Sequence, residues 1–111
     1  MTLTDFLQEP RCIFCDQKMV ILSTAKDCVE CPTHRDQQSD NYCWCWLRDD
    51  NTIYAINIKI DDWQLHFGLN NNETLVINRR SGKTTKFNRL LDMQLNKETL
   101  VSKMKTMVIF S

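Results

Sequence analysis

The sequence has few turn-forming residues and no long hydrophobic run. It contains two Gly and two Pro among 111 residues, so Asn and Asp must occupy most turns. No stretch approaches the roughly 18 apolar residues that a transmembrane helix requires. The first seven residues also lack the basic start and apolar stretch of a secretory signal. We therefore expect a cytoplasmic protein that does not span a membrane.

Groups suited to acid–base catalysis are equally scarce. The chain has two histidines, His34 and His66, and neither belongs to a recognisable Ser/His/Asp or Cys/His pattern. No pair of carboxylates stands out as a general acid and base. The sequence therefore predicts a protein that is not an enzyme.

Composition and charge describe an ordinary folded chain with an uneven charge distribution. Hydrophobic residues make up 42% and charged residues 25%, as in globular proteins, and the length suits a single domain over 1–111. The net charge is zero, yet residues 1–75 hold 6 basic and 12 acidic side chains, whereas residues 76–111 hold 8 basic and 2 acidic. The C-terminal third is thus strongly basic.

Cysteine is the informative excess, because all six cysteines lie within the first 45 residues. In a chain without an export signal we expect reduced thiols rather than disulfides. Cys12 and Cys15 form one C-x-x-C pair and Cys28 and Cys31 form a second, with 12 residues between the pairs. Two such turns can direct four thiolates at one tetrahedral zinc ion. The four cysteines are therefore predicted to bind a structural Zn²⁺.

This arrangement resembles a zinc ribbon over about residues 10–34. In that family each C-x-x-C forms a knuckle at the end of a hairpin, and residues 18–23 are apolar enough for one of its strands. The family often has Gly after the first pair, where this chain has Asp16, a residue that tolerates left-handed backbone better than most. The resemblance implies a structural ion held by four cysteines.

Three further residues leave alternatives for the metal site. His34 follows Cys31 by three positions and could replace one thiolate, giving three sulfurs and one imidazole. Cys43 and Cys45 share one face of an expected strand. They could form a second site with His34, or be small buried side chains of the core.

From residue 42 to 90 the sequence predicts an antiparallel β-meander of four or five strands. Apolar side chains alternate with polar ones along 53–60 and 63–69, with a weaker alternation along 74–79. Clusters rich in Asp, Asn, Ser and Gly separate these segments at hairpin spacing. A last strand is expected at about 83–89.

After the meander, residues 96–110 are predicted to form an amphipathic helix. Asn96 can cap it. Its apolar positions recur at helical spacing and comprise Leu100, Val101, Met104, Met107 and Val108. A helix on one face of a meander gives an α+β fold.

Function is open to three hypotheses. The first is a non-enzymatic, zinc-stabilised adaptor that binds a protein partner. The second is a nucleic-acid-binding module in which a basic hairpin meets phosphates through Arg79, Arg80, Lys83, Lys86 and Arg89. The third is a small zinc enzyme whose open coordination position is made by His34, Cys43 or Cys45.

The layout of the chain, with a zinc knuckle near one end and a helix at the other, also resembles small accessory proteins of phages and other viruses. That likeness implies an accessory or virion-associated role, in the host cytoplasm or the virion. The aromatic strand at 42–47, if it lies at a sheet edge, would favour association into a homo-oligomer.

Overall fold

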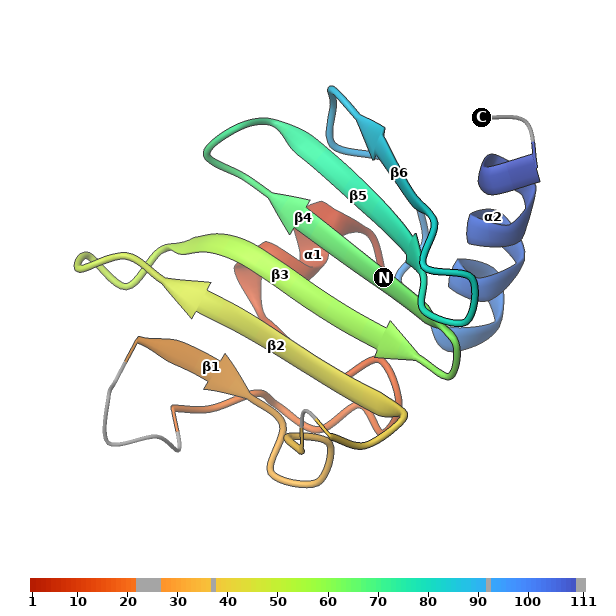
Figure 1. The fold of residues 1–111 in the computed structure, drawn as a ribbon. Helices are drawn as coiled ribbons and strands as arrows, with labels where there is room; N and C mark the ends of the chain where they lie inside the picture. Colours follow the sequence, from red (N-terminus) through yellow and green to blue (C-terminus); the bar gives the residue numbers. More distant parts are fainter. Residues whose placement is uncertain (22–26, 37, 92, 110–111) are drawn as a thin grey trace.

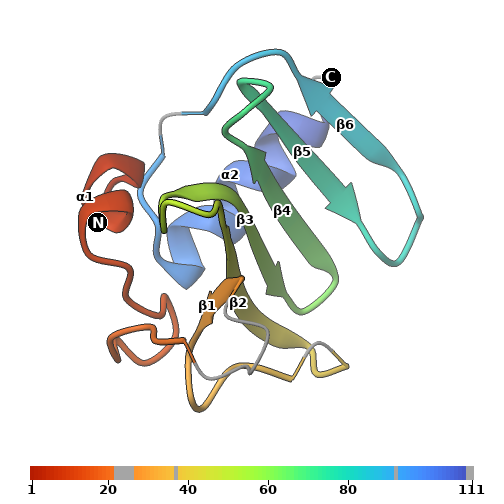
Figure 2. The ribbon, with the colours of Figure 1, turned by 90° about the vertical axis from the view of Figure 1, so that its left-hand side faces the viewer.

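A computed structural model describes residues 1–21, 27–36, 38–91 and 93–109 of the chain. Its centre is an antiparallel sheet of six strands that follow one another in sequence order (Figure 1). The strands are β1 (Cys28–Glu30), β2 (Asn41–Leu47), β3 (Ile53–Ile60), β4 (Trp63–Gly68), β5 (Glu73–Asn78) and β6 (Thr84–Phe87). Two helices, α1 (Leu3–Gln8) and α2 (Lys97–Ile109), lie on the same side of the sheet (Figures 1 and 2). The fold is therefore α+β, and strands β2 to β6 form the predicted meander.

The turns of the meander use Asn and Asp as the composition predicts. Positive φ angles occur at Asn51, Asp61 and Asn72, which lie in the three successive turns from β2 to β5. Gly82, with a φ of 76°, supplies the same conformation between β5 and β6. These left-handed positions suit the tight connections between antiparallel strands.

The sheet face that meets the helices forms the core. Five side chains of β3 and β4 on this face are fully buried and join Phe6 of α1 and Leu100 and Met104 of α2 in one cluster. They are Ile56, Ile58, Ile60, Leu65 and Phe67, and Ile53 and Trp63 pack partly buried against the same cluster. The predicted alternation is thus confirmed in β4 and from Ile56 to Ile60 in β3. At the start of β3 the register shifts opposite Trp46 and Leu47, so Ile53 packs on the core and Tyr54 lines a hollow with Trp46 and His66. On β5, Thr74 and Val76 point into the core, and Leu75 and Ile77 face the other way.

Two elements at the N-terminal end were not predicted. The helix α1 has only six residues, and Thr2 and Asp5 cap its first turn by exchanging side-chain to backbone hydrogen bonds. Residues 28–30 form strand β1, where the sequence pattern predicts the start of a metal knuckle. In the predicted 18–23 strand, Lys18 and Val20 form isolated bridges to Arg11 and Glu30, and residues 22–26 lie outside the described part.

The C-terminal helix matches its prediction closely. Asn96 Oδ1 accepts a hydrogen bond of 2.9 Å from the Thr99 amide, and Leu100 and Met104 are buried. Val101 and Met107 pack partly buried against the same core. The side chain of Val108 and residue 110 lie outside the described part. Among the described residues no helix combines the length and hydrophobicity needed to cross a membrane.

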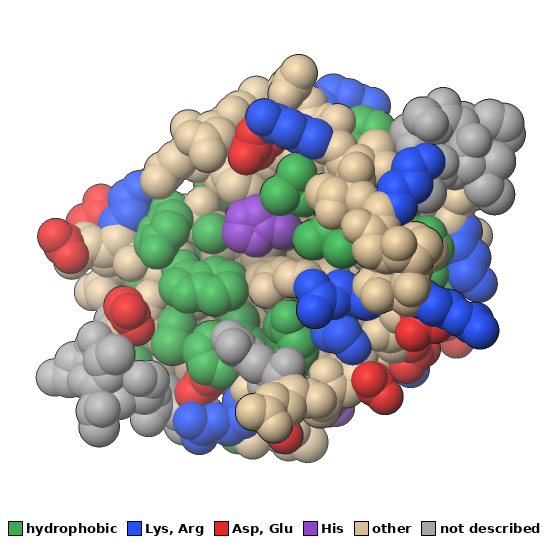
Figure 3. All heavy atoms as spheres, in the orientation of Figure 1, with side chains coloured by type: hydrophobic (Ala, Val, Ile, Leu, Met, Phe, Trp, Pro, Cys, Tyr) green, Lys and Arg blue, Asp and Glu red, His purple; other side chains and the backbone are tan. Residues whose placement is uncertain are grey.

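Neither helix covers the opposite face of the sheet, which we call the open face. Strand register assigns to it a central row that crosses all six strands, one residue from each. The row consists of Glu30, Trp44, Asn57, His66, Leu75 and Lys86. Figure 3 views this face and shows hydrophobic side chains gathered around a histidine, with lysine and arginine side chains toward the β5–β6 side.

Candidate metal centre

The first half of the centre is a tight turn between α1 and β1. A bridge between Arg11 and Lys18 closes the turn, and the Cys12 amide donates to the Gln17 carbonyl at 2.9 Å. Asp16 adopts a φ of 60°, which is the left-handed conformation expected where related turns have Gly. The turn therefore presents Cys12 and Cys15 toward the same point.

The second half is the turn that follows β1. Cys31 stands immediately after the strand, and His34 lies three residues further on. The His34 carbonyl accepts a hydrogen bond of 3.3 Å from the Cys43 amide, so this turn is fixed to β2. In both halves two residues separate the two side chains, as C-x-x-C in the first half and as C-x-x-H in the second.

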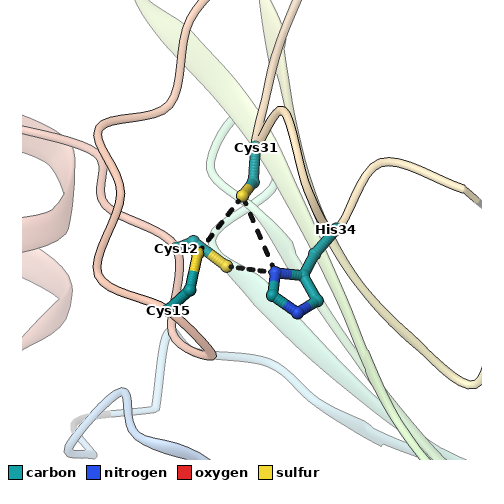
Figure 4. A group of neighbouring side chains, drawn as sticks. All are labelled: Cys12, Cys15, Cys31 and His34. Carbon is teal, nitrogen blue, oxygen red and sulfur yellow. Dashed lines mark hydrogen bonds between the residues drawn. The ribbon is translucent and has the colours of Figure 1, made fainter.

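These four side chains converge on one centre (Figure 4). One ligand atom from each of Cys12, Cys15, Cys31 and His34 lies within 4.8 Å of the other three. The His34 Nδ1 atom is 3.4 Å from Cys12 Sγ and 3.7 Å from Cys31 Sγ. The Sγ atoms of Cys15 and Cys31 are 3.5 Å apart, and both cysteines are free thiols. The group could hold a metal ion.

Backbone amides support the two buried sulfurs. The Phe14 amide donates to Cys12 Sγ and the Thr33 amide donates to Cys31 Sγ, each at 3.4 Å. Each donor is two residues beyond its cysteine, so the two turns repeat the same local geometry. Amides pointing at sulfur favour the thiolate, the form that binds metal.

The two sulfurs nevertheless have different acidities. Burial raises the pKa of Cys12 well above its ordinary value. At Cys31 burial acts in the same direction, but hydrogen bonds from the His34 backbone and side chain and from the Thr33 amide outweigh it. The pKa of Cys31 falls to about 7.

Sequence reasoning placed Cys28 in the metal site, and the structure does not bring it into this group. Cys28 belongs to β1, and its register partner is Trp46 on the open face. Burial raises the pKa of its thiol, and the carboxylates of Glu30 and Asp27 raise it further. The fourth position is filled instead by His34, the replacement that the spacing after Cys31 allows.

Among the described residues, the structure does not group Cys43 and Cys45 with His34 as a second metal site. Both cysteines face the helices from β2 and are fully buried in the core. Cys43 Sγ packs 3.9 Å from the Met19 sulfur. Cys43 and Cys45 are therefore small buried side chains of the core, which was the other interpretation that the sequence allowed.

The predicted basic hairpin is present and exposed. Arg79, Arg80 and Lys83 lie in the turn between β5 and β6, Lys86 is on β6, and Arg89 follows it. Lys86 pairs with Glu73 at 3.2 Å. None of these five residues belongs to the candidate metal centre.

No protein-family model, curated protein or solved structure matches this chain. Neither the zinc ribbon nor the viral likeness gains support from such comparisons. What the protein does must therefore be inferred from the metal centre and from the surfaces around it.

Proposed function

We propose that the protein is a zinc-stabilised, non-enzymatic module that binds a macromolecular partner on its open face. The observation that carries the proposal is the open face itself, where neither helix covers the side chains of Trp44, Trp46 and His66. A sheet face with uncovered aromatic groups is an effective binding surface, because aromatic rings contribute large contact areas at low entropic cost.

The metal centre supports a structural role for the ion. Three thiolates and one imidazole would fill a tetrahedral coordination sphere and suit Zn²⁺. A catalytic zinc site keeps one position for water or substrate. The ion would join the turn at Cys12 to the turn after β1, and both turns adjoin the sheet edge that carries the aromatic residues.

Replacing zinc with Co²⁺ tests the structural role of the metal. We expect one metal per chain by native mass spectrometry, and a Co²⁺ absorption spectrum typical of tetrahedral sulfur-rich coordination. Added cyanide or azide should leave that spectrum unchanged, because no ligand is exchangeable. A spectrum that shifts with these anions would indicate an open position and favour the zinc-enzyme hypothesis.

Binding through the open face is tested by capture from a cell lysate with three immobilised forms of the chain. The variant Trp46→Ala/Leu75→Ala alters the open face, and Lys103→Gln/Lys105→Gln alters exposed positions of α2 as a control. We expect a partner that the wild type and the α2 variant retain and the open-face variant loses. Identical captured sets from all three forms would contradict the proposal.

A further inference from the structure

The open face combines three features that together point to the chemistry of its partner. They are an aromatic platform at the β2 side, a hydrogen-bonded polar row across the strands, and a set of cations at the β5–β6 side that form no ion pair with any described residue. Each rests on contacts among described residues.

The aromatic platform consists of Trp44 and Trp46 on β2. Their ring centroids are 6.3 Å apart and the rings are tilted by 35°. The Trp44 indole N–H donates to the Arg35 carbonyl at 2.8 Å, which fixes the orientation of that ring. Both side chains remain partly exposed.

Beside Trp46 the face is hollowed into a cavity of about 360 Å³. Its lining includes Trp46, Tyr54, His66, Asn70 and Asn71. Gly68 adds no side chain to this lining, and the Arg48 guanidinium lies 5.9 Å from the Tyr54 ring centroid. The cavity thus offers ring faces, amides and a nearby cation, which suits a planar heterocycle carrying hydrogen-bonding groups.

The polar row links Tyr42, Asn57, Gln64 and Arg79 across the sheet. The Asn57 amide donates to the Tyr42 hydroxyl at 3.4 Å, and the Gln64 amide donates to Asn57 Oδ1 at 2.8 Å. Arg79 completes the row by donating to Gln64 Oε1 at 3.2 Å. The mutual hydrogen bonds orient these groups before any partner arrives, and Arg79 has further N–H donors to offer.

The third feature is a group of cations at the β5–β6 side of the sheet. Among the residues that the structure describes, no carboxylate lies within 4.0 Å of Arg79, Arg80, Lys83 or Arg89 in an ion pair. Residues 76–91 contain no Asp or Glu. Two acidic side chains of the open face already have cationic partners. Glu30 pairs with Arg35, and Glu73 pairs with Lys86. The electrostatic complement of this side is therefore an anion such as phosphate.

We propose that the open face binds single-stranded nucleic acid, with bases on the Trp44–Trp46 platform and phosphates at the β5–β6 hairpin. This inference rests on the proposed function, because it names the partner of the same surface. Aromatic stacking combined with a cationic track is how proteins bind unpaired strands. A duplex keeps its bases stacked inside and would leave the platform unused. A second copy of this chain would instead have to desolvate the polar row and Lys59.

Fluorescence anisotropy with the zinc-loaded full chain tests the inference. The probes are labelled poly-dT and poly-U strands of about 12 nucleotides, a length within the range of single-strand sites, and a duplex of equal length. We expect the single strands to bind at least about tenfold more tightly than the duplex. Equal binding of the duplex would overturn the inference.

Two sets of variants separate the contributions of phosphates and bases. Arg79→Gln/Arg80→Gln/Lys83→Gln/Arg89→Gln should weaken binding and reduce the slope of log affinity against log salt by up to about 3, since each lost contact with a single strand removes about 0.7. The control Lys18→Gln/Lys97→Gln/Lys103→Gln removes three exposed cations outside this hairpin. Per cation removed, it should change the affinity and the salt slope less. Equal losses in the two variants would contradict a defined phosphate track.

Trp46→Ala should weaken single-strand binding about 5- to 150-fold, the usual effect of removing one stacking partner, with little change in the salt slope. Trp46→Phe should restore much of the affinity, because a ring remains. Unchanged binding by Trp46→Ala would overturn the assignment of the platform.

The same samples distinguish failure of this inference from failure of the proposed function. A chain that is metal-loaded by native mass spectrometry and folded by circular dichroism, yet binds no oligonucleotide, overturns only the nucleic-acid partner. Dimerisation that Trp46→Ala abolishes, or a Trp46-dependent protein partner, would do the same. A chain whose free energy of unfolding and whose β1–β2 edge are unchanged when the metal is removed would instead contradict zinc stabilisation.

Discussion

At the residue scale, Cys31 is the position shared by two overlapping motifs. Cys28-x-x-Cys31 and Cys31-x-x-His34 have the same spacing, and both residues of the second pair, but only Cys31 of the first, belong to the group that could hold a metal ion. We predict that Cys31→Ser loses the metal and that Cys28→Ser keeps one ion per chain. Zinc release measured with a chromophoric chelator checks both variants. Metal loss from Cys28→Ser with retention in His34→Ala would reverse the assignment.

The overlap also explains how far the sequence could predict the site. Spacing alone identifies Cys12, Cys15 and Cys31, because two intervening residues suit a turn around one ion. It cannot choose between Cys28 and His34. The choice depends on β1, since pairing with β2 holds Cys28 in an extended strand opposite Trp46, away from the turn that begins at Cys31. Such pairing involves residues far apart in the chain.

His66 provides a second prediction at this scale. Burial lowers the pKa of its imidazole below the ordinary 6.5, and the nearby Glu73 carboxylate partly offsets the shift. Histidine therefore binds a proton more readily in the unfolded chain than in the folded one. The free energy of unfolding should fall as the pH decreases from about 6.5 through the folded pKa.

An imidazole NMR titration of the folded, metal-loaded chain measures this pKa directly. We expect a value below 6.5 in the wild type and a lower one in Glu73→Gln, because that substitution removes the carboxylate that favours the protonated ring. A wild-type value at or above 6.5 would show that the partial burial of His66 does not lower the pKa of its imidazole.

At the scale of elements, one hydroxyl fixes the chain after β6 against β5. Thr74 is fully buried; its Oγ1 donates to the Arg89 carbonyl at 2.8 Å and accepts from the Leu91 amide at 3.1 Å. We predict that Thr74→Val lowers the free energy of unfolding by about 1–3 kcal/mol, because it leaves buried polar groups unpaired. Urea denaturation of the metal-loaded protein measures the change.

Thr74→Ser is the matched control, since it keeps the hydroxyl and removes only a methyl group. Its cost should be about 0.8 kcal/mol, the usual contribution of one buried carbon. If the serine variant were the less stable of the two, packing rather than hydrogen bonding would hold this segment.

The elements that the sequence predicts are those with a repeating local signal. Alternation over six to eight residues indicates β3 and β4, and helical spacing with the Asn96 cap indicates α2. The helix α1 and strand β1 are too short to show either a strand-like alternation or a helical spacing of apolar residues. Isolated helices of six residues are also not stable in water. α1 exists because Phe6 is buried in the core, and β1 because it pairs with β2.

At the scale of the whole molecule, the candidate metal centre lies toward the β1–β2 edge of the sheet. Its buried members Cys12 and Cys31 belong to the same hydrophobic core as Ile56, Ile58, Leu65, Leu100 and Met104, but those five residues supply no proposed ligand. By contrast, β2 depends directly on the metal turn through the Cys43 amide bonded to the His34 carbonyl and the Trp44 indole bonded to the Arg35 carbonyl. Loss of the metal should therefore destabilise β1 and β2 more than β3 to β5.

Hydrogen exchange of the zinc-loaded and chelator-treated chains tests this difference between the strands. At a free zinc concentration of 100 times Kd, any opening that requires metal release is opposed by about 2.7 kcal/mol, so chelation should accelerate exchange of such amides about 100-fold. We expect this acceleration in residues 12–18, in β1 and in the Cys43 amide of β2, with little change in β3 to β5.

Cys28→Ser, which should retain the metal, serves as the control that follows the wild type. Equal acceleration at all amides would show instead that the whole fold requires the metal, and no acceleration would show that the four-residue group contributes nothing to the β1–β2 edge. The uneven outcome has a functional consequence, because the edge that loosens carries Trp44, and an oligonucleotide that stacks on Trp44 should bind the zinc-loaded chain more tightly than the metal-free one.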